Sequence, residues 1–232
     1  MAAAAPAIWA HRGARAVAPE NTLEAFRRAF ELGADGVELD VHCTADGCLV
    51  VHHDADAPGL GVLGERTRAE IGEARPDIPT LEEALDCSAG HLVNVEIKHT
   101  RGTDGDPGAD ALVALLAERG QRDDVLVSSF DLATIDRVRE LDPDLPTGFL
   151  LLPGADLDEA IACCVERGHR ALHPGLFALS GDLAVQAVDA AHATGLAVNV
   201  WTVNDPADVQ RLARAGVDAI ITDVPDVARA AL

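Results

Sequence analysis

The sequence has no apolar run that approaches the ~20 residues a membrane helix needs. Its first residues, MAAAAP, lack the basic and long apolar stretches of a secretory peptide. The pattern of a first strand already begins at Ile8. We therefore expect no stable membrane insertion and a cytoplasmic location.

Basic residues are scarce. The chain has 18 Lys and Arg against 39 Asp and Glu, for a formal net charge of −21. Such an excess of negative charge argues against nucleic acid and anionic membrane surfaces as partners. It favours a ligand that is neutral or is neutralised locally by cations. Much of the acidity also fits solvated helix surfaces, which need no functional explanation.

Cysteine is also infrequent, with five in 232 residues. Because the number is odd, at least one cysteine has no partner within the chain. Cys43 and Cys48 flank a predicted turn and could face each other. In a cytoplasmic chain we expect them to be reduced.

The most informative stretch is 36–54, GVELDVHCTADGCLVVHHD. Its first part alternates apolar and polar residues, as a strand does, so Glu38 and Asp40 point in the same direction. Asp46 and Gly47 favour a tight turn, and the apolar run that follows predicts a return strand. Antiparallel pairing would bring His53 to about the level of Glu38.

Apart from this return strand, eight predicted strands alternate with helical patterns. This number in 232 residues predicts a (β/α)₈ TIM barrel, a single domain over 1–232 with a short insertion at about 54–79. The alternative is an open doubly wound sheet, but no Gly-x-Gly-x-x-Gly follows the first strand. The expected strands are 8–11, 37–42, 92–98, 125–128, 147–151, 171–173, 197–201 and 219–222.

Helices are expected between these strands. The first opens with PENT at 19–22 and stops at Gly33, and another starts at 79–83, where Thr80 and Glu83 have capping-box spacing. A short helical piece is expected near 68–73 and a flexible loop over 102–108. The remaining helical patterns cover 109–119, 132–141, 157–167, 182–193, 207–215 and 225–231.

Polar residues collect where the predicted strands end, the face on which barrels carry their chemistry. Glu38, Asp40 and Glu96 would repel one another if they met without a cation. A divalent metal resolves that conflict, and oxygen ligands favour a hard ion, Mg²⁺ or Ca²⁺. The alternative is that each carboxylate pairs with its own cation, for which only Arg12 and Lys98 lie nearby.

His11 and His53 come from two separate strand ends. An imidazole titrates near neutrality, so one ring could accept a proton while the other donates one. His42 lies nearer the turn and His52 points the other way along the strand, so neither is assigned a role.

Arg12 and Lys98 supply positive charge at the same predicted face. Together with a metal they would hold an anionic oxygen group, and phosphate fits best.

The chain resembles the glycerophosphodiester phosphodiesterases, which are metal-dependent barrels. The similarity covers most of the sequence in the family's order, so it does not depend on one motif. The matching segments are HRG (11–13), PENTLEAF (19–26), GADGVELDVHCTADG (33–47), VVHHD (50–54), PTLEEAL (79–85), VNVEIK (93–98), SSF (128–130), WTVND (201–205) and GVDAIITDVPD (216–226).

This resemblance implies one divalent cation on Glu38, Asp40 and Glu96, and an acid–base pair of His11 and His53. Arg12 and Lys98 would then contact the phosphate. Glu20 and Asn21 would lie behind the site or cap the helix that follows them. Trp201 would lie beside the glycerol, and Ser128, Phe130 and His173 would lie along the pocket.

The implied reaction splits a small-molecule glycerophosphodiester into sn-glycerol 3-phosphate and an alcohol. The resemblance suggests that the glycerol 2-hydroxyl attacks first, giving a cyclic phosphate that water opens. The residues themselves fit direct attack by water equally well. The family usually continues after its His-Asp pair with Arg-Thr-Thr and a longer insertion, whereas this chain has ADAPGLGV at 55–62. We expect a short cap over the leaving alcohol.

Two other functions fit parts of the sequence. Lys98 at a barrel strand end could form a Schiff base, as in an aldolase. Alternatively, the barrel could bind phosphorylated glycerol without catalysis, although no histidine or carboxylate of the pattern is missing.

Overall fold

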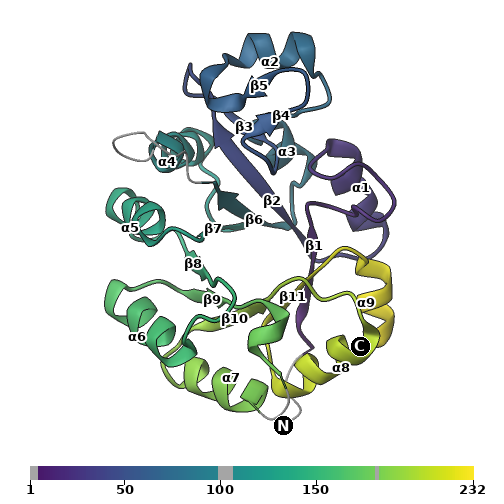
Figure 1. Cartoon of the computed structure of the whole chain (residues 1–232), viewed down its shortest axis with the longest axis vertical. Coiled ribbons are helices and arrows are strands. Elements are labelled where there is room, and N and C mark those ends of the chain that lie inside the picture. Colours follow the sequence, from purple (N-terminus) through teal and green to yellow (C-terminus); the bar gives the residue numbers. More distant parts are fainter. Residues whose placement is uncertain (1–4, 99–106, 181–182) are drawn as a thin grey trace.

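In the computed structural model, which describes residues 5–98, 107–180 and 183–232, eight parallel strands form a closed barrel inside a ring of helices (Figure 1). β1 pairs in parallel with both β11 and β2, and this double pairing closes the sheet. The predicted (β/α)₈ barrel is confirmed. Its strands are β1 (Ala7–His11), β2 (Gly36–Cys43), β6 (Leu92–Ile97), β7 (Val125–Ser129), β8 (Thr147–Leu150), β9 (Ala171–His173), β10 (Ala197–Val200) and β11 (Ala219–Thr222).

The helices bury their apolar faces against these strands. In α1, for example, Ala25, Phe26 and Ala29 are buried, and Thr22 caps the first turn by accepting a hydrogen bond from the Ala25 N–H. The helices are α1 (Leu23–Glu31), α2 (Arg68–Ala74), α3 (Leu81–Cys87), α4 (Pro107–Arg119), α5 (Leu132–Leu141), α6 (Leu157–Arg167), α7 (Leu183–Ala193), α8 (Pro206–Ala215) and α9 (Pro225–Ala231).

Most helix boundaries agree with the sequence pattern to within two residues. The loop predicted over 102–108 lies mostly outside the described residues, and Pro107 and Gly108 belong to α4. Asp182, the first residue of the helix predicted at 182–193, also lies outside the described residues. Within the described ranges no helix is both long and apolar enough to cross a membrane.

β3 (Leu49–Val51) returns antiparallel to β2, as the turn chemistry predicts. Val51 pairs with Val41, and just beyond it the His52 N–H donates to the Asp40 carbonyl at 3.0 Å. Continuing this register would place His53 opposite Leu39, one residue from the predicted level. The hairpin therefore returns His53 to the strand that carries Glu38 and Asp40.

The chain after β3 forms a small unit outside the ring, at the top of Figure 1. It comprises β4 (Asp56–Ala57), β5 (Gly61–Val62), the 3₁₀ helix η1 (Leu63–Glu65) and α2. Its own apolar cluster contains Val50, Ala57, Leu63, Ile71 and Ile78. α3 then begins at Thr80, whose capping box with Glu83 is present as predicted.

Polar groups are also buried inside the barrel. His173 on β9 is fully buried, and its Nε2 accepts a hydrogen bond from the Asn199 amide at 2.9 Å. A side chain at Gly148 on the neighbouring β8 would bring a Cβ within 2.5 Å of that same nitrogen, so glycine makes room for the ring. Burial lowers the pKa of His173 to about 3.

This buried histidine predicts a loss of stability in mild acid. The pKa of His173 in the folded protein, about 3, lies below its ordinary value of 6.5. The contribution of the neutral ring to folding stability is therefore fully present above pH 6.5 and is lost as the pH falls from there towards 3. The free energy of unfolding should fall by about 1.4 kcal/mol for each pH unit in this range because of His173 alone. Urea titrations between pH 4.5 and 7.5 would measure it.

The control for that experiment is His173→Gln, which cannot take up the proton. Its unfolding free energy should depend less on pH than that of the wild-type protein. Equal slopes for the two proteins would contradict the assignment.

Candidate active site

Three carboxylates meet at the end of two neighbouring strands. Glu38 and Asp40 lie two residues apart on β2, and Asp40 pairs with Glu96 on β6. All three side chains are buried, and one oxygen from each lies within 4.8 Å of the other two. The structure thus brings together the whole carboxylate set that the sequence predicts.

Two cations lie against this set. The Lys98 ammonium is 2.8 Å from Asp40 Oδ1 and 2.5 Å from Glu96 Oε1, while Arg12 Nε is 3.3 Å from Asp40 Oδ2. Glu38 accepts a hydrogen bond from the Arg12 backbone N–H at 3.0 Å. The three carboxylates therefore do not each have a cation of their own, because Lys98 and Arg12 both lie against Asp40.

The three carboxylates consequently differ in acidity. Burial would raise the pKa of Asp40, but Lys98 and Arg12 hold it below its usual range. Burial raises the pKa of Glu38 well above its ordinary value, and the charges of Asp40 and Glu96 add to the shift. The pKa of Glu96 is raised to about 7, again chiefly by burial, with Asp40 adding to it. Full ionisation of the set needs more positive charge than Lys98 and Arg12 supply.

Residues behind the site hold Arg12 and Asp40 in place. Glu20 accepts a hydrogen bond from Arg12 Nη1 at 2.8 Å, and the Asn21 amide donates to Asp40 Oδ2 at 2.8 Å. Arg12 and Asn21 adopt left-handed backbone conformations, with φ of 56° and 57°. Residues other than glycine adopt this conformation at a cost, and such strain clusters at functional sites. Thr22 caps α1, so Glu20 and Asn21 are not its cap. They contact Arg12 and Asp40 in the site.

Each predicted catalytic histidine is tied to a carboxylate. His11 Nδ1 lies 2.7 Å from Asp223 Oδ1, and His53 Nδ1 lies 2.8 Å from Asp54 Oδ1. A carboxylate on Nδ1 favours the tautomer with its proton there, which leaves Nε2 as the nitrogen able to exchange a proton. Burial lowers the pKa of His53.

Both rings line a cavity of about 150 Å³ at the end of the barrel. Eight residues are predicted to bind the metal or the substrate or to act as acid and base, and all of them except Asp40 line this cavity. The lining residues are His11, Arg12, Glu38, His53, Asn94, Glu96, Lys98, Phe130, Leu150, Trp201 and Ile221.

Trp201 at the end of β10 is an anchored wall of this cavity. Its indole N–H donates to the His173 carbonyl at 2.8 Å, and Phe130 meets its ring edge-on with a centroid distance of 5.5 Å. Ser128 and His173, which the resemblance places along the pocket, do not line this cavity. Both side chains are turned into the barrel, where they bond to Asn94 and Asn199.

Sequence reasoning gives no role to several residues that support the histidines. Asp223 lies 212 positions from His11 in the chain and is itself held by the Asn204 amide at 2.8 Å. His42 Nε2 is 3.1 Å from the His53 carbonyl, on the strand opposite. Asp223 follows the last barrel strand directly, which is the one sequence signal that could have found it.

The model of the glycerophosphoryl diester phosphodiesterase family matches residues 11–227. The chain belongs to this family. A glycerophosphodiester phosphodiesterase of Caldanaerobacter subterraneus is 37% identical over an alignment of 237 positions, which covers 94% of each protein. One from Bacillus subtilis is 32% identical, over 94% of this chain and 83% of that protein. The protein is thus an enzyme, a phosphoric diester hydrolase.

Solved structures of this family have the same fold. The Thermotoga maritima enzyme aligns with a TM-score of 0.83 at 30% identity, covering 96% of each chain. An Oleispira antarctica phosphodiesterase, solved with the product sn-glycerol-3-phosphate, aligns with a TM-score of 0.83 at 27% identity. That alignment covers 98% of this chain and 96% of the other.

The ion pairs around Lys98 predict a specific loss of stability. In metal-free buffer near pH 7, Lys98→Met should lower the free energy of unfolding by about 3 kcal/mol, because it leaves buried carboxylates without their cation. Denaturant titration with a chelator present would measure the change. The double variant Lys98→Met, Glu96→Gln is the control and should recover part of the loss. A change below about 1 kcal/mol in the single variant would contradict this electrostatic account.

Proposed function

We propose that the enzyme hydrolyses glycerophosphodiesters to sn-glycerol 3-phosphate and an alcohol in the 150 Å³ cavity. The observation that carries the proposal is the meeting of three buried carboxylates with two carboxylate-tethered histidines in one small volume. The product seen in the Oleispira antarctica relative supports the choice of products.

We assign one divalent cation, Mg²⁺ or Ca²⁺, to Glu38, Asp40 and Glu96. The donor set fits such an ion, since it offers only oxygen atoms, close together and buried. Burial and, after it, the neighbouring carboxylates raise the pKa values of Glu38 and Glu96, and a bound cation would favour the ionised form of both side chains. When bound, the ion would polarise the phosphoryl group and offset its developing charge.

Arg12 and Lys98 are the proposed contacts to the phosphate. Both side chains line the cavity, and each is held by carboxylates rather than by flexible surface contacts. Fixed positive groups stabilise the charge that grows on phosphoryl oxygens in the transition state. Trp201, with Phe130 against its ring, would pack against the carbon atoms of the glycerol.

His11 and His53 are the proposed acid and base. One Nε2 removes the proton of the attacking hydroxyl, and the other gives a proton to the departing alkoxide. Asp223 and Asp54 hold the rings through Nδ1. Both the glycerol 2-hydroxyl and a water molecule are compatible with this arrangement as the first nucleophile.

We propose that the short segment after Asp54, which follows His53 directly in the chain, limits contacts to the leaving alcohol. Arg66, its first arginine, donates to the Leu60 carbonyl at 3.1 Å within the segment itself. We further propose that residues 1–232 act as one domain, in the cytoplasm.

The Schiff-base alternative is disfavoured by the surroundings of Lys98. Burial lowers the pKa of this amine, but Asp40 and Glu96 more than offset the effect and raise it. A Schiff-base lysine has to lose its proton to become a nucleophile. A non-catalytic binder is likewise disfavoured, because both histidines keep carboxylate partners that binding alone would not need.

Replacing either histidine should remove most of the activity. His11→Ala and His53→Ala should each lower kcat by about 10²–10⁴-fold, as expected for loss of a general acid or base. Turnover of a panel of glycerophosphodiesters, followed as release of sn-glycerol 3-phosphate, would measure the effect. His52→Ala is the matched control, since that ring bonds to the Asp54 carbonyl and does not line the cavity. Near-normal turnover in either variant would refute the acid–base assignment.

Chelation should abolish turnover, and added Mg²⁺ or Ca²⁺ should restore it. Glu38→Gln and Asp40→Asn should each weaken cation binding by about tenfold or more, because each removes an anionic oxygen from the set. Calorimetric titration of each ion into metal-free protein would measure the affinity. Glu73→Gln, at an exposed position of α2, serves as the control. An unchanged affinity would remove that residue from the ligand set.

A further inference from the structure

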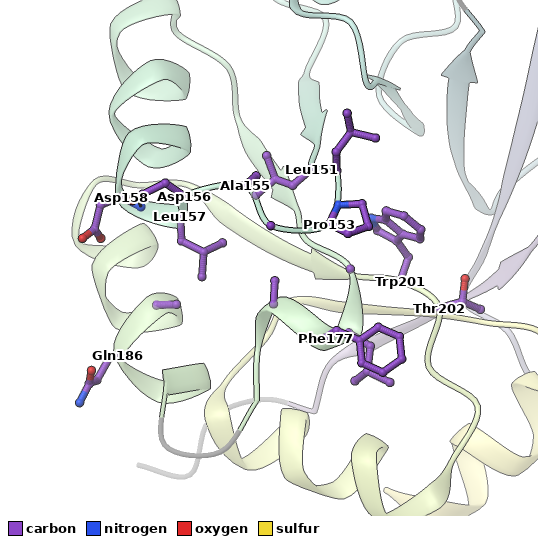
Figure 2. Close-up of a pocket in the computed structure, with 16 residues that line it drawn as sticks. Leu151, Pro153, Ala155, Asp156, Leu157, Asp158, Phe177, Gln186, Trp201 and Thr202 are labelled. Atoms are coloured by element: carbon purple, nitrogen blue, oxygen red, sulfur yellow. Dashed lines mark hydrogen bonds between the residues drawn. The ribbon is translucent and has the colours of Figure 1, made fainter.

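A second, larger cavity lies beside the active site. Its volume is about 770 Å³, within the roughly 300–1,000 Å³ of small-molecule sites. The loop after β8, the 3₁₀ helix η2 (Leu176–Ala178) and the start of α7 form its walls (Figure 2). At its mouth Phe177 is 93% exposed and Leu152 is 65% exposed. They are the two most exposed large apolar side chains in the described part of the protein.

The two cavities share one wall. Trp201 lines both, and Pro153 lies beside its indole ring in Figure 2. Leu150 lines the active-site cavity, and the next residue, Leu151, lines the larger one. An apolar surface therefore runs from the catalytic residues out to Phe177.

The lining also indicates what kind of group fits. The described residues that line the larger cavity include no lysine, arginine or histidine, so a second phosphate has no cation to meet there. Its two carboxylates, Asp156 and Asp158, lie at the N-terminal end of α6, and Asp156 caps that helix. An uncharged hydrocarbon chain matches the remaining wall.

We propose that the larger cavity binds an acyl chain carried on the glycerol of the substrate, so that the enzyme also cleaves lysophospholipids. This inference rests on the proposed function, which puts the glycerol against Trp201. A chain on that glycerol would pass over Trp201 towards Leu151 and Phe177. The headgroup alcohol would leave on the opposite side, near His53.

The chemistry of the proposed step is unchanged. The phosphorus–oxygen bond to the headgroup alcohol breaks, the alcohol takes up a proton, and one water molecule supplies the new oxygen and proton. The products are a lysophosphatidic acid and the free alcohol. A 1-acyl substrate keeps its 2-hydroxyl, so either nucleophile remains available.

The test compares glycerophosphodiesters with their 1-acyl derivatives of 6 to about 12 carbons, kept below their critical micelle concentrations. Choline, ethanolamine and glycerol headgroups are used, and mass spectrometry measures lysophosphatidic acid release. The ratio of kcat/KM for the acylated to the unacylated substrate should rise with chain length. The upper limit is about fourfold for each methylene removed from water.

Variants locate the chain. Phe177→Ser with Leu152→Ser should lower kcat/KM for the longest lysophospholipid by about tenfold, since it exposes several methylenes, and leave the unacylated substrate unchanged. Ala155→Trp should act in the same direction by filling the cavity. Val165→Ser is the matched control, because Val165 is exposed on α6 but does not line the cavity.

The possible outcomes separate the two proposals. Turnover of the unacylated diester without any dependence on chain length overturns the acyl site and leaves the proposed function standing. Absence of turnover with every headgroup overturns the proposed function as well. The kcat/KM ratio could also stay constant with chain length while the Phe177→Ser variant changes its oligomeric state. That result would show that the cavity is a protein interface and would also overturn the acyl site.

Discussion

Mutual repulsion among Glu38, Asp40 and Glu96 is the constraint on which the site depends. Each of these side chains is buried, so water screens little of the repulsion. Lys98 and Arg12 offset part of it at Asp40, whereas burial and the neighbouring carboxylates together raise the pKa values of the two glutamates. The proposed cation would offset this cost, and with Arg12 and Lys98 it would attract an anionic phosphate to a protein of net charge −21.

Closure of the barrel puts His11, one of the two histidines proposed to transfer protons, beside these carboxylates. β1 lies between β2 and β11. His11, at the end of β1, therefore pairs with Glu38 on β2 and bonds through its side chain to Asp223, which follows β11. The hairpin partner of β2 supplies His53 from a different direction. An open sheet would leave β1 and β11 at separate edges and could not form the His11–Asp223 pair.

Local signals in the sequence predict much of this arrangement. Caps such as Thr80 and the alternation of Glu38 and Asp40 along one strand are readable because they depend on neighbours within a few residues. Asp223 is not readable in this way, since its contact with His11 spans 212 positions and exists only once the barrel closes. For His173 the resemblance predicts the pocket wall, yet the ring lies inside the barrel because Gly148 leaves space there. Phe177, in a short 3₁₀ turn, has no periodic pattern that reveals its exposure.

The small cavity divides into a charged half and an apolar half, and the division follows the strands. Charged residues come from β1, β2 and β6 and from the residues that follow β1, β3 and β6, whereas Phe130, Leu150, Trp201 and Ile221 come from β7, β8, β10 and β11 or the turns that follow them. In the proposed mechanism, bond cleavage depends on the first group. The 3₁₀ helix η2 with Phe177 does not line the cavity that Glu38 and Glu96 line. Changes in η2 can therefore alter which substrates fit without disturbing the balance of charge at Asp40.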